Sequence, residues 1–155
     1  MFQDERVNPI HSIFISERQA PERVAFSVYL SHDETHTGIG EKVRYDAVLL
    51  NEGNGYSPHI AAFTAPTKGI YLFAFNIAKW RVGQAYVRLM KNGNIINSAA
   101  VDVSRPNDDQ HAGNVALVEL GVGDVVYVEE YHQDNAVIHG DTVNRFTTFS
   151  GVLLI

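Results

Sequence analysis

The sequence of 155 residues predicts an all-β fold, in which two antiparallel sheets pack as a sandwich of jelly-roll type. Three observations lead to this prediction. Short apolar segments recur with turn residues between them, and they are spaced by about 8–12 residues. Several of these segments alternate apolar and polar residues with the period of two that is typical of strands. No segment keeps a helical period for more than about two turns. Counting the segments predicts about ten strands.

The first predicted strand covers residues 23–30, where every second residue is large and apolar. The next covers residues 46–50 and ends at the turn sequence 51–55, which is rich in asparagine and glycine. A third covers residues 60–64 between two prolines. Asparagine, glycine and proline interrupt strands, so these three segments are expected to be short.

The most apolar predicted strand covers residues 70–80. Alternation places aromatic and aliphatic residues on one of its faces, namely Tyr71, Phe73, Phe75 and Ile77. The opposite face is also apolar and carries Ile70, Leu72 and Ala74. A strand that is apolar on both faces is expected to be covered on both, here by the core and by another subunit.

A hairpin is predicted where residues 85–91 and 95–101 flank the pair Asn92-Gly93, because both positions suit the positive φ angles of a type I′ turn. The remaining predicted strands cover residues 115–120, 125–131 and 146–154. Residues 1–22 are charged and mixed in period, so we expect them to form an extension or linker ahead of one domain over 23–155.

Composition excludes several classes of protein. The hydrophobic share is 45% and the charged share 19%, which is ordinary for a globular domain. A net charge of −6 without a basic run argues against nucleic acid as a partner, and no apolar run is long enough to insert in a membrane. The absence of cysteine excludes disulfides and thiol nucleophiles.

A series of ordered blocks begins with the strand 24–30 and continues with 45–56, 63–66, 69–75, 89–93, 120–127 and 149–154. With these blocks in order, the chain from residue 23 onward, about 130 residues, resembles the globular head of complement C1q, within the tumour-necrosis-factor-like jelly-roll superfamily. The resemblance implies a non-enzymatic homotrimer that is secreted, its signal peptide being absent from this chain. Two departures stand out: Ala61 replaces a glycine that the family usually carries, and no collagen-like repeat precedes the domain.

The motifs of the resemblance are structural. Six glycines are expected to allow backbone angles or close approaches that a Cβ would block: Gly53, Gly55, Gly69, Gly93, Gly123 and Gly151. Five aromatic residues are expected to fill the sandwich core or a three-fold interface: Tyr71, Phe73, Phe75, Tyr127 and Phe149. Function is therefore expected in the loops.

Two polar clusters could bind a metal ion. His32 and His36 flank two carboxylates in a segment that we expect to be a loop, where a metal site competes with an ordinary solvated loop. The second cluster follows residue 107. The resemblance implies a calcium site in the corresponding loop, with Asp108, Asp109 and Gln110 as ligands, and this site competes with an ordinary acidic turn of the kind that asparagine and aspartate favour. Calcium is the one cofactor that the resemblance implies.

A third polar stretch runs from Tyr131 to His139 and is expected to be an exposed loop. It combines aromatic, amide and carboxylate side chains, the set that binds sugars by stacking and by hydrogen bonds to hydroxyls. The predicted ligand-binding residues are Tyr131, His132, Gln133, Asp134, Asn135 and His139.

No nucleophile-elbow serine and no phosphate-binding glycine loop is present, so an enzyme is not expected. Two functions remain. One is a pattern-recognition protein of innate immunity that binds carbohydrate or microbial surfaces. The other is a structural or receptor-binding trimeric ligand without lectin activity.

Overall fold

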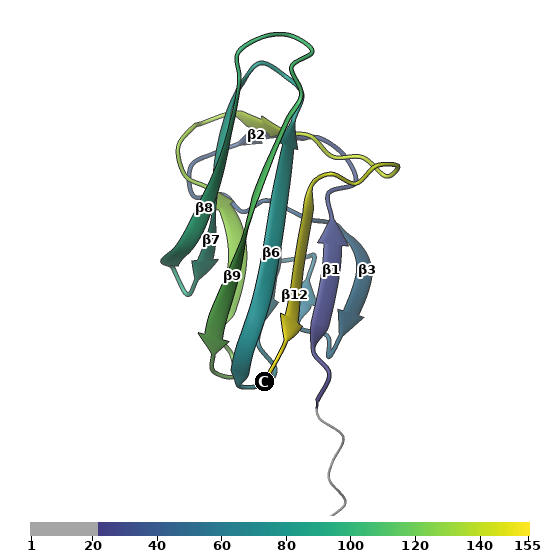
Figure 1. Ribbon diagram of the computed structural model, residues 1–155, viewed down its shortest axis with the longest axis vertical. Coiled ribbons are helices and arrows are strands. Elements are labelled where there is room, and N and C mark those ends of the chain that lie inside the picture. The colour runs from purple at the N-terminus through teal and green to yellow at the C-terminus, as the bar shows by residue number, and fades with distance from the viewer. Residues whose placement is uncertain (1–21) are drawn as a thin grey trace, which may run out of the picture.

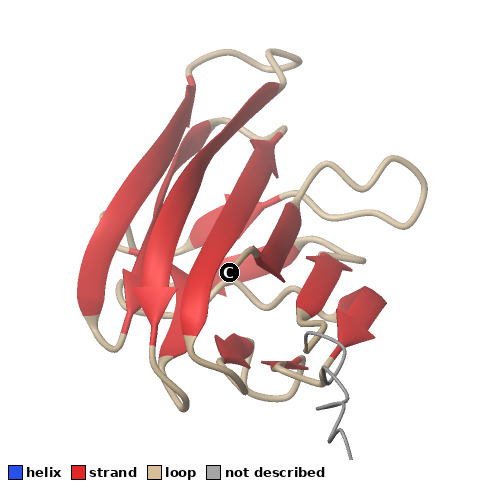
Figure 2. Cartoon of the chain, turned by 60° about the horizontal axis from the view of Figure 1, so that its bottom comes forward, coloured by secondary structure: helices blue, strands red, loops and turns tan. Residues whose placement is uncertain are grey.

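A computed structural model describes residues 22–155, and within that range the chain forms twelve strands and no helix (Figures 1 and 2). The predicted extension over residues 1–22 lies outside the described residues except for Glu22. No helix of the described chain is long and apolar enough to cross a membrane.

Ten of the strands form two five-stranded antiparallel sheets, which confirms the predicted jelly-roll sandwich. The first, named here the β6 sheet, has the order β3 (Ala47–Glu52), β1 (Ala25–Tyr29), β12 (Thr148–Leu153), β6 (Gly69–Lys79) and β9 (Gln110–Leu120). The second, the β7 sheet, has the order β4 (Tyr56–Ser57), β5 (Ala62–Thr64), β10 (Val125–Glu130), β7 (Gly83–Lys91) and β8 (Asn94–Val103). Except for the pairs β4–β5 and β7–β8, neighbouring strands in these sheets are not consecutive in sequence, as in a jelly roll.

The core lies between the two sheets and is built mainly from aromatic rings. Phe26 of β1 contacts Phe63 at 5.0 Å and Phe149 at 4.9 Å between ring centroids. The predicted inner face of β6 is confirmed, because Tyr71, Phe73, Phe75 and Ile77 are all fully buried. Gly151 of β12 is required here, because a Cβ would lie 2.5 Å from the Phe26 ring and 2.8 Å from the Phe73 ring. Of the five aromatic residues assigned to the core or an interface, Tyr127 lies outside the core: it is half-buried on β10, below the Lys42 ammonium group, and whether it lies in an interface stays a prediction.

The outer face of the β6 sheet stays apolar. Register places Leu72 opposite both Leu117 and Val152, and Ala74 opposite Val115. Leu117 is 66% exposed and Val115 is 58% exposed. We name this surface the apolar face; it comprises Leu50, Leu72, Ala74, Val115, Leu117 and Val152.

The predicted hairpin at Asn92-Gly93 is confirmed, since these residues join β7 to β8 with φ angles of 48° and 81°. Both central residues have the positive φ that a type I′ turn requires. The Asn92 side chain also donates to Asp124 and accepts from the backbone N–H of Val125. The turn is thereby tied to the neighbouring strand β10.

Two loop predictions need correction, because a small third sheet joins them. Residues Glu34–Thr37 form β2 and Ala136–Ile138 form β11, and the two strands pair antiparallel. The segment from His32 to His36 is therefore partly a strand, and so is the stretch from Tyr131 to His139. Ala136 and Ile138 are buried, which explains why this part of the predicted loop is ordered as a strand.

Six connections meet at one end of the sandwich, here called the loop end, opposite the C-terminus and at the top of Figure 1. Strand register brings them together: Lys79 at the end of β6 pairs with Gln110 at the start of β9, and Gly83 pairs with Val103. The connections cover residues 30–33, 38–46, 80–82, 104–109, 131–135 and 139–147. All of the predicted binding residues lie on or beside this end.

Candidate functional site

An aromatic patch lies where the β7 sheet reaches the loop end. It comprises Tyr86, Arg88, Tyr131 and His132. The Tyr86 ring meets the Tyr131 ring edge to face, with centroids 6.0 Å apart, and lies 4.4 Å from the His132 ring. The Arg88 guanidinium lies 5.0 Å above the Tyr131 ring. His132 is exposed, and both tyrosines are half-buried.

Strand alternation builds this patch. Ala85, Val87 and Leu89 of β7 are buried in the core, so Tyr86 and Arg88 point to the outer surface. Register then pairs Glu129 of β10 with Arg88, and the Tyr131 N–H donates to the Tyr86 carbonyl at 2.9 Å. Arg88 and Glu129, which are 41 positions apart in sequence, are thereby set side by side.

Two glutamates, Glu129 and Glu130, bind residues of the aromatic patch and fix their positions. Glu130 is fully buried, and its carboxylate accepts backbone N–H groups of Tyr86, His132 and Gln133 at 3.0–3.2 Å. Burial raises the pKa of Glu130, although these hydrogen bonds act in the opposite direction. Glu129 pairs with Arg88 at 2.9 Å. The rings are therefore positioned before any ligand arrives.

The rest of the predicted loop continues from this patch. Gln133 is half-buried, and Asp134 is exposed with its carboxylate 3.4 Å from the N–H of Ile39. Asn135 is exposed and has a positive φ of 60°, a conformation that asparagine tolerates well. Amide and carboxylate groups thus follow the aromatic patch within the same connection, and whether they bind a ligand stays a prediction.

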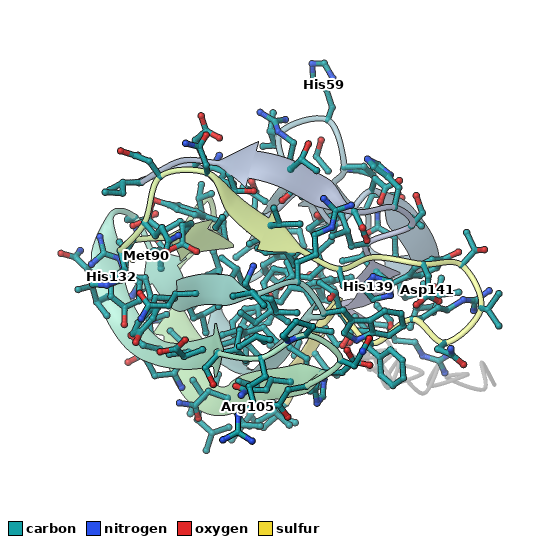
Figure 3. All side chains as sticks on the ribbon, turned by 90° about the horizontal axis from the view of Figure 1, so that it is seen from above. His59, Met90, Arg105, His132, His139 and Asp141 are labelled. Atoms are coloured by element: carbon teal, nitrogen blue, oxygen red, sulfur yellow. The ribbon has the colours of Figure 1, made fainter. Side chains whose placement is uncertain are left out.

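His139 belongs to a different cluster. Its Nδ1 lies 2.8 Å from Asp33, its Nε2 lies 2.9 Å from Asp141, and its ring stacks on Trp80 at 3.4 Å. Figure 3 shows His132 and His139 on opposite sides of the loop end. The structure therefore splits the six predicted ligand-binding residues into a group of five and a separate histidine.

In the predicted metal alternative at His32–His36, the three members His32, Asp33 and Glu34 are directed to different partners. His32 lies 3.6 Å from Asp46, while Asp33 turns to His139. Glu34 accepts the backbone N–H of Arg44 at 2.8 Å, and burial raises its pKa. Across the described part of the chain, no group of three histidine or carboxylate side chains is arranged to hold a metal ion.

Of the predicted calcium ligands, Asp108 and Asp109 lie in the β8–β9 connection, which also contains the Arg105 labelled in Figure 3, and Gln110 is the first residue of β9. Asp108 and Asp109 are exposed. Gln110 is half-buried, and its side-chain oxygen accepts the backbone N–H of Asp102 at 3.2 Å. These oxygen donors are adjacent in sequence at the junction of the connection with β9, and whether calcium binds them stays a prediction.

Sequence reasoning missed Tyr86 and Arg88. The alternation of residues 85–91 contained a usable signal, because it places both side chains on the face away from the core. Sequence reasoning missed Glu130 for a different reason. A carboxylate at a strand end is usually solvated, and only the tertiary structure shows that this one is buried.

Comparisons with known proteins agree with this architecture. The family model for the C1q domain matches residues 25–154. Caprin-2 of Danio rerio is 30% identical over 133 residues, which are 85% of this chain and only 14% of that protein. The chain thus spans a small part of this relative.

Solved structures share the fold at low identity. The globular domain of zebrafish complement 1qA protein has a TM-score of 0.69 at 19% identity, covering 85% of this chain and 98% of that one. Eiger TNF from S. frugiperda also has a TM-score of 0.69, at 10% identity over 86% of this chain and 94% of that one. Because the family model matches nearly the whole described chain, this protein belongs to the C1q domain family and has the C1q/TNF-like jelly-roll fold.

Proposed function

We propose that this protein is a secreted, trimeric recognition module of innate immunity that binds carbohydrate on microbial surfaces through the aromatic patch. The observation that carries the proposal is the set of three rings and one guanidinium held in place by Glu129 and Glu130. C1q domain proteins are generally secreted and non-enzymatic, which favours extracellular binding over catalysis.

The chemistry of the patch suits a sugar ring. Tyr131 and His132 offer flat faces for the apolar side of a pyranose. The side chains of Gln133, Asp134 and Asn135 follow within the same connection and can exchange hydrogen bonds with hydroxyl groups. Each such bond replaces one to water, so its net contribution is about 0.5–1.5 kcal/mol. One site is therefore expected to bind weakly.

Repetition of the site compensates for weak single contacts. A homotrimer would present three copies of the patch to a surface with repeating sugars, and linked binding raises avidity by about 10²–10⁴-fold without any new contact. Binding is therefore expected for polysaccharide and is expected to be nearly absent for the corresponding monosaccharide.

The test is binding of the full chain to immobilised mannan, β-glucan, peptidoglycan and lipopolysaccharide, with free monosaccharides as competitors. Replacing Tyr131 and His132 together by alanine is expected to weaken polysaccharide binding by at least about tenfold, the equivalent of 1.4 kcal/mol. The matched control is His59→Ala, which changes an exposed histidine that projects from another side of the molecule in Figure 3.

Two results would contradict the proposal. One is unchanged binding by the double variant, since the site would then lie elsewhere. The other is a protein that binds none of the four polysaccharides yet binds a protein partner tightly, which would favour a receptor-binding trimeric ligand. Melting curves of the variants establish that lost binding is not caused by unfolding.

A further inference from the structure

We propose that Trp80 is the platform of a second carbohydrate site, where its indole ring stacks against one face of a pyranose. The site lies on the side of the loop end where Figure 3 shows His139, on which the indole is stacked. The aromatic patch, with His132, lies on the opposite side. The ligand class rests on the proposed function, but the site shares no residue with the aromatic patch. Two separate sites on one chain are expected to hold a polysaccharide surface at two points.

Trp80 keeps a large apolar ring at the surface. It directly follows β6 and is 38% exposed. The odd-numbered residues from Tyr71 to Lys79 are buried, so alternation directs position 80 to the outer side of the sheet. Tryptophan offers a large and rigid contact area, and it is enriched among the residues that dominate binding energies. An exposed indole at the end of a strand is therefore suited to ligand contact.

Ring contacts fix the orientation of the indole before any ligand arrives. The His139 ring stacks on it, with centroids 3.4 Å apart and 17° between the planes. The Phe146 ring meets it in a T-shaped arrangement at 5.9 Å. Since His139 covers one face of the indole, the opposite face is the one left for a ligand. A ring that is already held loses little conformational entropy on binding.

The contacts of His139 make this support firm, whatever the charge of the imidazole. Nδ1 lies 2.8 Å from Asp33, and Nε2 lies 2.9 Å from Asp141. A neutral imidazole carries one N–H and an imidazolium carries two, so at least one carboxylate accepts a hydrogen bond in either state. Backbone N–H groups of residues 143–145 in turn hold Asp141. Three segments thus fix the platform: those before β2, after β6 and after β11.

Polar groups border the platform, as a sugar site requires. Arg81 follows Trp80, and its guanidinium lies 3.8 Å from Asp33 Oδ2. The Arg81 side chain is 65% exposed and the Asp33 side chain is 34% exposed. A guanidinium only donates hydrogen bonds and a carboxylate only accepts them, so the pair matches both roles of a sugar hydroxyl. A stacking surface and hydrogen-bonding groups therefore meet at one place.

A second copy of the chain is the competing occupant, because Trp80 and the apolar face lie on the same side of the β6 sheet. Polar groups separate the two. Asn76 lies between Ala74 and Trp80 on that side, and its side chain donates to the Thr148 hydroxyl at 3.2 Å. Register places the exposed Gly113 opposite Asn76. The apolar face thus ends before the platform, which favours a polar ligand over another apolar surface.

The experiment titrates the full chain with soluble mannohexaose, laminarihexaose and chitohexaose and records tryptophan emission. Trp80 is the only tryptophan in the sequence, so the signal comes from this site. Concentrations reach about 10 mM, ten times a dissociation constant of about 1 mM. At least one oligosaccharide is expected to shift the emission saturably to shorter wavelength, because a stacked sugar displaces water from the indole. Tyr131→Ala combined with His132→Ala is expected to keep this shift.

Two arginines provide a matched pair of variants. Arg81→Ala is expected to raise the dissociation constant measured by Trp80 emission about two- to tenfold, which corresponds to the loss of one hydrogen bond of ordinary strength. Arg105→Ala changes an exposed arginine of another connection, labelled in Figure 3, and is expected to leave the constant unchanged. An unchanged constant in Arg81→Ala would overturn the site.

The platform is also overturned by emission that none of the three oligosaccharides changes. Acrylamide is expected to quench Trp80 in the free protein, and failure to quench would show that another copy covers the ring. Retention on immobilised polysaccharide separates this site from the aromatic patch. Unchanged emission, with retention that Tyr131→Ala combined with His132→Ala abolishes, overturns the platform and supports the patch. A saturable emission change, with retention that the double variant leaves intact, does the reverse.

Discussion

At the scale of single residues, Ala61 occupies a position that suits glycine better. It lies in the turn between β4 and β5 with a positive φ of 53°, and its side chain is buried. An L-residue in the left-handed region is strained by about 1–2 kcal/mol. Glycine would relieve this strain. It would also lose a buried methyl group, worth about 0.8 kcal/mol, and make the unfolded chain more flexible by about 0.5–1 kcal/mol.

Because these contributions nearly cancel, Ala61→Gly is expected to change the free energy of unfolding by less than about 0.5 kcal/mol. Its neighbour Ala62 is equally buried but lies in strand β5. There, no backbone strain offsets the loss of the buried methyl group and the greater flexibility of the unfolded chain. Ala62→Gly is therefore expected to lower the free energy of unfolding by about 1.5 kcal/mol. Urea denaturation of both variants measures the contrast, and equal losses would show that Ala61 carries no strain.

Single residues also differ in whether their place in the structure could be predicted from the sequence. Phe73 and Phe75 could be placed in the core because the period of two is a local property of the chain. The partnership of Tyr86 with Tyr131 could not, because it depends on the register between β7 and β10. His139 was predicted as a ligand-binding residue of an exposed loop, yet its partners Asp33 and Trp80 come from two other segments.

At the scale of elements, the long strands were predictable, whereas the short strands β2, β4 and β11 were not. β6 and the β7–β8 hairpin follow from apolar alternation and from Asn92-Gly93. β2 consists of Glu34–Thr37, which has no apolar face, and it forms because β11 offers a partner. Strands of three or four residues take their conformation from tertiary contacts rather than from their own propensity.

The β8–β9 connection is the element that tests the calcium prediction. If Asp108, Asp109 and Gln110 ligate the ion, Ca²⁺ at about ten times its dissociation constant is expected to stabilise the fold by about 1.4 kcal/mol. For a domain of this size that is a rise in melting temperature of roughly 3–6 °C. Asp109→Ala is expected to abolish the rise, whereas Asp134→Ala, in another loop, is expected to keep it. Identical melting curves in calcium and in chelator would exclude the site.

At the scale of the whole molecule, the apolar face is expected to be covered by another protein chain. Leu117, Val115 and Val152 lie together on the β6 sheet with Leu72 and Ala74, and a concavity of about 240 Å³ opens between β1, β3, β6 and β12. Monomeric proteins rarely expose continuous apolar surface of this kind. C1q/TNF-like domains typically form trimers, so three copies of this chain are the expected occupants.

A substitution that tests assembly must lie on the apolar face and not in the core, because a core substitution would unfold the chain. Glutamate at Tyr71 or Phe73 would put a charge in the core, where both rings are fully buried, and would unfold the chain whether or not it assembles. Leu117 is 66% exposed in the single chain, so Leu117→Glu leaves the fold intact and places an unpaired charge only in the assembled interface.

Light scattering of wild type is expected to give three times 17.2 kDa, and Leu117→Glu is expected to give 17.2 kDa with a folded circular dichroism spectrum. Val143→Glu, on the connection 139–147 and 83% exposed, is the matched control and is expected to stay trimeric. A wild type that is monomeric at micromolar concentration would contradict the assembly, and it would also remove the multivalency on which weak sugar sites depend.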